Sequence, residues 1–92
     1  MSVEADLDRA NRARAIIDNP TYQESFDLVR QAIIEQWEAT PIRDRDGAHE
    51  LKLMLKLLGD TRANLERAIA DGKLAAHELE FRRTTKLADF RR

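Results

Sequence analysis

The sequence lacks cysteine and contains only three glycines, two prolines and 5% aromatic residues in 92 positions. Without cysteine, the chain has no disulfide bonds and no thiolate metal sites. Thirteen alanines make up a large part of its 42% hydrophobic content, and side chains this small suit close helix packing better than a thick sheet core. An all-β fold is therefore nearly excluded.

Neither sign of charge dominates, and the sequence has no long hydrophobic run. Sixteen basic and 17 acidic residues give a formal net charge of −1, so the whole chain is neither a polycation nor an acidic tail. The N-terminal residues are acidic, unlike a signal peptide. Lys52 and Lys56 interrupt the longest apolar cluster, 51–58, which is far shorter than the roughly 20 residues of a membrane span. We expect a soluble, cytoplasmic protein.

Hydrophobic periodicity predicts two helices in the first half of the chain. Apolar residues spaced three and four apart indicate a helix over 4–18, which Asn19-Pro20 should end. Thr21 and Glu24 have the spacing of a capping box, which predicts the start of a second helix. That helix carries a stripe expected to anchor the core: Tyr22, Phe26, Val29, Ile33 and Trp37, widened by Leu28 and Ile34.

A third helix should follow the polar loop 42–47, with Asp44 or Asp46 as its cap. Its apolar stripe consists of Leu51, Met54, Leu58, Thr61, Leu65 and Ala68. Leu53, Leu55 and Leu57 lie off that stripe, so the 51–58 segment is apolar around most of its circumference and requires burial on two sides. Gly72 is typical of a helix end, which leaves 73–83 as a fourth helical segment.

These elements predict an all-α fold, a small helical bundle. Its centre is an antiparallel helical hairpin of the second and third helices, flanked by the N-terminal helix and a short C-terminal helix. Residues 1–83 should form a single helical domain, and 84–92 a basic C-terminal tail.

Sequence motifs for catalysis or metal binding are incomplete. The two histidines, His49 and His77, each lack a second histidine four residues later, as a zinc-protease helix requires. Glu35 and Glu38 supply one half of the paired acidic motifs of all-α nucleotide pyrophosphatases. The other half would need an acid at Leu53, and leucine cannot bind a cation. We therefore expect no enzyme activity, no metal and no cofactor.

The excess apolar surface of the third helix predicts an interface with a second copy or another protein. The candidate interface residues are Leu53, Met54, Leu57, Leu58 and Gly59. Glycine inside a helix costs about 1 kcal/mol relative to alanine, so Gly59 indicates a kink or the close approach of another backbone. Large exposed apolar patches normally mark interaction surfaces.

A second candidate site is the basic C-terminal segment. Residues 81–92 carry a local charge of +4, against −5 for the remainder, through Arg82, Arg83, Lys86, Arg91 and Arg92. Such a cluster can neutralise nucleic-acid phosphates, with Phe81 and Phe90 stacking on bases. We favour the simpler interpretation that it is a solvated tail, or a segment whose arginines pair with the acidic surface of a neighbouring subunit.

Three segments also resemble small helical proteins encoded among tailed-bacteriophage genes: Arg12-Ala-Arg-Ala-Ile-Ile-Asp-Asn-Pro20, Glu35-x-Trp37-x-x-Thr40 and the Leu-rich helix ending at Gly72. This likeness spans about residues 10–72 and transfers no site residues. It implies an accessory or virion-associated protein in the bacterial host cytoplasm or the virion.

The leading functional hypothesis is a non-enzymatic assembly or adaptor protein that forms a homo-oligomer. Two alternatives remain open. One is a nucleic-acid-binding or DNA-packaging accessory acting through the basic segment. The other is an inhibitor of a bacterial host protein that uses an acidic helix face such as Glu35 and Glu38.

Overall fold

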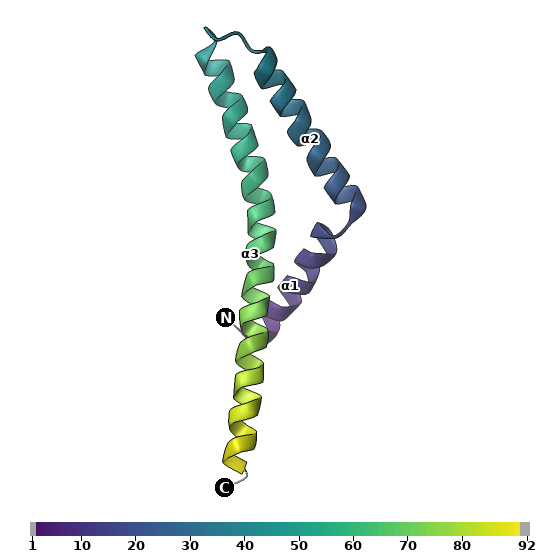
Figure 1. Cartoon of the computed structure of the whole chain (residues 1–92), viewed down its shortest axis with the longest axis vertical. Coiled ribbons are helices and arrows are strands. Elements are labelled where there is room, and N and C mark those ends of the chain that lie inside the picture. Colours follow the sequence, from purple (N-terminus) through teal and green to yellow (C-terminus); the bar gives the residue numbers. More distant parts are fainter. Residues whose placement is uncertain (1, 91–92) are drawn as a thin grey trace. The chain divides into compact units, whose positions relative to one another are not determined.

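The computed structural model describes residues 2–90, with side chains described as far as residue 85. It contains three helices, α1 (Val3–Ile17), α2 (Pro20–Ala39) and α3 (Arg45–Phe90), and no strand within the described residues (Figure 1). The all-α prediction is therefore confirmed. No helix in the described part of the chain is both long and apolar enough to cross a membrane.

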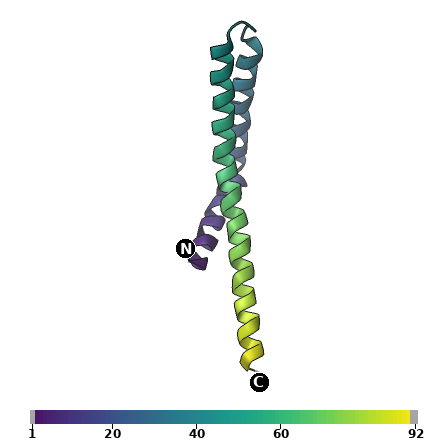
Figure 2. The same cartoon turned by 90° about the vertical axis from the view of Figure 1, so that its left-hand side faces the viewer.

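The chain divides into two compact units, and α3 contributes to both. One unit combines α1, through Ile16, with the part of α3 that begins at Leu65. The other unit is Ile17–Asn64, which contains α2 and the first part of α3. Within this second unit, α2 and the first part of α3 lie next to each other at the loop that joins them and diverge away from it (Figure 1); in the turned view the two helices overlap (Figure 2).

The start of α2 differs from the expected capping box. Asn19 is the N-cap, and its Oδ1 accepts hydrogen bonds from the backbone N–H groups of Thr21 at 2.8 Å and Tyr22 at 3.2 Å. Pro20 occupies the first turn, where its missing N–H costs nothing and its fixed φ favours the helix. The capping-box prediction at Thr21 was wrong because Asn19-Pro20, which ends α1, also begins α2.

The predicted cap of α3 is confirmed at Asp44. Its Oδ1 accepts a hydrogen bond from the backbone N–H of Gly47 at 2.9 Å. Just before it, the Thr40 N–H donates to the carbonyl of Trp37 at 3.1 Å and closes the last turn of α2. A hydrogen bond therefore fixes each end of the short loop between the two helices.

The predicted helix end at Gly72 was wrong. The helix continues through it to Phe90, so the expected fourth segment is part of α3, and no described glycine has a positive φ. Gly72 is instead buried against α1, where a Cβ atom added to it would overlap the Cβ of Ala10 and lie 3.5 Å from the carbonyl oxygen of Asp6. This glycine permits close helix contact rather than ending a helix.

The core is small and consists mainly of small side chains. Its buried hydrophobic residues are Val3, Ala10, Ala13, Ile33, Leu51, Ala68 and Ala75. In the unit that contains α1, alanines and Gly72 allow the helices to approach closely. No large side chain among the described residues is fully buried.

The apolar stripe of α2 faces α3 only in part, contrary to its expected role as the core anchor. Ile33 is buried, and Tyr22 and Phe26 are half-buried with their ring centroids 6.1 Å apart. The guanidinium of Arg62 on α3 lies 5.1 Å from the Phe26 ring centroid, a cation–π contact. Val29 and Trp37 are exposed, because a single neighbouring helix covers only one side of α2.

Candidate functional site

The predicted interface residues of α3 are largely exposed. Leu53, Met54 and Leu57 are 46%, 48% and 65% exposed, whereas Leu58 is half-buried beside α2. Gly59 is exposed, and a Cβ atom added to it would meet nothing within 4 Å. Within the chain, α2 therefore covers one side of the 51–58 segment and leaves the other side open.

Two of the exposed residues line a groove that carries no charged side chain. We call it the apolar groove, and it has a volume of about 330 Å³. Its lining consists of Val29 and Ile33 from α2 with Met54, Leu57, Leu58 and Thr61 from α3. Leu28, which precedes Val29 in the sequence, is 64% exposed and does not line the groove. Leu53 and Gly59 do not line this groove, so the five predicted interface residues do not all lie together.

A second surface of the same unit combines apolar and basic side chains. We call it the basic face; it comprises two adjoining hollows of about 610 and 350 Å³. Its residues are Arg30, Ile34 and Trp37 from α2 and His49, Lys52, Leu53, Leu55 and Lys56 from α3. The two hollows share Arg30, Lys52 and Leu55, so they form one continuous surface.

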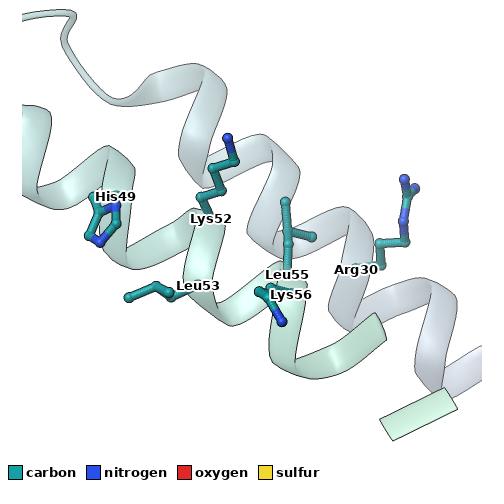
Figure 3. Close-up of a pocket in the computed structure, with 6 residues that line it drawn as sticks. All are labelled: Arg30, His49, Lys52, Leu53, Leu55 and Lys56. Atoms are coloured by element: carbon teal, nitrogen blue, oxygen red, sulfur yellow. The ribbon is translucent and has the colours of Figure 1, made fainter. Parts of the chain in front are cut away.

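Figure 3 shows how the larger hollow is built. Arg30 comes from α2, and the Lys52 and Leu55 side chains extend from α3 toward α2. His49 and Leu53 point away from α2, so the basic face continues around α3.

The cations of the basic face are only partly neutralised. Lys56 forms an ion pair with Asp60 at 3.0 Å, which is exposed and of the kind that contributes about 0–1 kcal/mol to stability. Within the described part of the chain, Arg30 and Lys52 form no ion pair. No carboxylate lines either hollow.

The apolar groove and the basic face lie on different sides of the two-helix unit. Lys52 and Leu57 are five residues apart on α3, which separates them by about 140° around the helix axis at 3.6 residues per turn. No residue lines both surfaces. One surface is thus uncharged and the other basic, and the two adjoin on α3, where Leu53 of the basic face lies one helical turn before Leu57.

The basic C-terminal candidates are only partly described. Arg82 and Arg83 are exposed on α3, and Arg82 forms an ion pair with Glu78 one turn earlier. The side chain of Lys86, together with Arg91 and Arg92, lies outside the described residues. Glu35 and Glu38 are exposed on α2, and Glu35 accepts a hydrogen bond from the Gln31 side chain at 3.2 Å.

Among the residues that the structure describes, neither histidine lies in a group that could hold a metal ion. No group of three or more His, Asp or Glu side chains is placed to hold a metal ion within residues that the structure describes. His49 belongs to the basic face, and His77 lines a small hollow with Lys73, Ala76 and Glu80.

The sequence reasoning missed the basic face, although its spacing was visible. Arg30, Ile34 and Trp37 are spaced four and three residues apart, as are His49, Lys52 and Lys56 in the reverse order. Each set therefore occupies one side of its helix. Trp37 was assigned to the core, and the lysines were considered only as interruptions of an apolar run.

The chain is thus all-α, with an exposed apolar groove and a basic face on its two-helix unit. Comparisons with protein-family models, curated proteins and solved structures found no match for this chain.

Proposed function

We propose that this chain is a non-enzymatic assembly or adaptor protein that associates with a second copy of itself through the apolar groove. In this proposal α2 and the first part of α3 act as an antiparallel helical hairpin, and two hairpins complete a four-helix core. The main supporting observation is that Val29, Met54 and Leu57 are exposed and line a groove without charged side chains. Contiguous exposed apolar surface of this kind marks an interaction site.

The dimensions of the two-helix unit, α2 with the first part of α3, support a dimer. The 20 residues of α2 give a length of about 30 Å, and each helix is about 10 Å wide. One side of the two-helix unit therefore offers roughly 600 Å² to a partner, half of the roughly 1,200 Å² buried in the smallest stable interfaces. A second copy that covers this side would bury the part of the 51–58 segment that α2 leaves exposed.

Charge supports a second copy as the occupant. The apolar groove contains no charged side chain, so two copies meet there without burying an unpaired charge. The net charge of −1 also leaves little repulsion between whole chains. A two-fold arrangement uses the same surface on both copies, which is the commonest form of homo-oligomer.

The experiment is light scattering after size exclusion, applied to the unchanged chain and two variants. Leu57→Glu places a carboxylate in the apolar groove, whereas Leu74→Glu is a matched control in the other unit, at 69% exposure against 65% for Leu57. We expect a dimer for the unchanged chain and for Leu74→Glu. Leu57→Glu should be monomeric and remain helical by circular dichroism.

The expected weakening follows from the exposed fraction. Full burial of a leucine contributes about 1.5–3 kcal/mol, and about two thirds of that gain remains available at Leu57. Because a symmetric dimer loses it twice, the dissociation constant should rise about 30-fold or more. A strict monomer at high micromolar concentration, or a dimer that Leu57→Glu leaves unchanged, would contradict the proposal.

A further inference from the structure

We propose that the basic face is a docking site for an acidic amphipathic helix of another protein. The occupant would insert aliphatic side chains over Ile34, Trp37 and Leu55 and direct its carboxylates toward the cations of α3. This proposal does not rest on self-association, because no residue of the basic face lines the apolar groove.

Charge complementarity favours an acidic occupant. Every charged side chain that lines the two hollows is basic, and Arg30 and Lys52 have no ion-pair partner within the described residues. A carboxylate placed there gains a partner without displacing an existing one. By helical spacing, Asp27 and Glu38 lie just beyond Ile34 around α2, outside the lining. The partner's carboxylates should therefore follow the edge that faces α3.

The apolar part of the basic face favours a helix over a nucleic acid. Ile34, Trp37 and Leu55 lie between two helices, and such a groove accepts a third helix through anchors spaced three, four and seven residues apart. Single-stranded nucleic acids bind through several aromatic platforms on which successive bases stack. Trp37 is the only aromatic side chain that lines the basic face, and aliphatic residues provide no such platform.

Trp37 provides a direct readout, because it is the only tryptophan in the chain and is 51% exposed. Its fluorescence can be titrated, at low ionic strength, with a designed peptide helix that carries leucines on one side and glutamates along one edge. We expect a saturable blue shift as the peptide excludes water from the indole. The same peptide with lysine in place of glutamate, and an oligodeoxythymidine, serve as competing probes and should bind at least about tenfold more weakly.

Two variants of equal charge change locate the binding site. Lys52→Glu reverses a charge in the basic face, and Lys73→Glu reverses an exposed charge in the other unit. We expect Lys52→Glu to raise the dissociation constant of the acidic peptide at least about tenfold, since a like charge then opposes the carboxylates. Lys73→Glu should change it less than about twofold. Arg30→Glu provides a second test on the other helix, with the same expected loss.

Three results would overturn the proposal. The first is the absence of a fluorescence shift with the acidic peptide. The second is equal weakening by Lys52→Glu and Lys73→Glu, which would indicate attraction by net charge alone. The third is tighter binding of the oligodeoxythymidine than of the acidic peptide, which would assign the basic face to nucleic acid.

Discussion

Replacing each of two glycines in α3 by alanine should have opposite effects on stability. Glycine inside a helix costs about 0.8–1 kcal/mol relative to alanine, so both substitutions gain the same helix propensity. At Gly59 the new Cβ meets nothing within 4 Å, and the gain should appear in full. For a chain of this size, 1 kcal/mol corresponds to about 4–8 °C in Tm. Gly59→Ala should therefore raise Tm by several degrees.

At Gly72 the same gain in helix propensity is opposed by a steric clash with α1. The new Cβ would overlap that of Ala10 and lie 3.6 Å from the Cα of Ala10, so α1 would have to move away. Overpacking of this kind costs about 1–3 kcal/mol, which equals or exceeds the gain in propensity. We expect Gly72→Ala to leave Tm unchanged or lower it, and to loosen α1.

Hydrogen exchange combined with thermal melts followed by circular dichroism measures both effects. Amide exchange in α1 should accelerate in Gly72→Ala and stay unchanged in Gly59→Ala. Adding Ala10→Gly to Gly72→Ala removes the overlapping Cβ and should restore protection of α1. If Gly72→Ala instead raises Tm as Gly59→Ala does, with α1 still protected, the close contact between Ala10 and Gly72 is refuted. If Gly59→Ala dimerises with the same dissociation constant as the unchanged chain, Gly59 does not lie in the dimer interface.

Three further substitutions test local features at the start of α2. Asn19→Ala removes the acceptor of two backbone N–H groups and should cost about 1 kcal/mol in the free energy of unfolding, measured by urea denaturation. Thr21→Ala should cost clearly less, and a larger loss at Thr21 would restore the capping-box interpretation. The Tyr22 hydroxyl is buried with no hydrogen-bond partner among the described residues. Tyr22→Phe should therefore be neutral or raise the urea midpoint, whereas a loss above about 1 kcal/mol would reveal a partner.

Hydrophobic periodicity was enough to predict the helices, because spacings of three and four residues depend only on helix geometry. The polar loop 42–47 limited the cap of α3 to Asp44 or Asp46, and the structure has it at Asp44, where the capping hydrogen bond is local. The prediction failed at Gly72, since whether a glycine ends a helix or admits a neighbour depends on α1, some sixty residues away. No pattern around Gly72 itself distinguishes the two roles.

Burial was less predictable than secondary structure. The stripe of α2 includes Ile33 and Trp37 on one side, yet Ile33 is buried and Trp37 is half-exposed. A stripe shows which residues can share a side of a helix, while the number of neighbouring helices decides which of them are covered. The basic face was missed because it combines Arg30 of one helix with Lys52 of another, and the spacing within each helix does not show that the two lie side by side.

The two units use different packing, and this difference explains where association is expected. Alanines and Gly72 bring α1 and α3 into close contact, and the exposed large hydrophobic residues of that unit lie outside this contact: Ile16, Leu74, Leu79 and Phe81. In that unit, His77 and Glu78 separate the exposed Leu74 from Phe81 along α3, and isolated hydrophobic residues on a surface are ordinary. In the Ile17–Asn64 unit, three exposed hydrophobic residues, Val29, Met54 and Leu57, line the apolar groove together. Association should therefore respond to a charge at Leu57 and tolerate the same charge at the equally exposed Leu74.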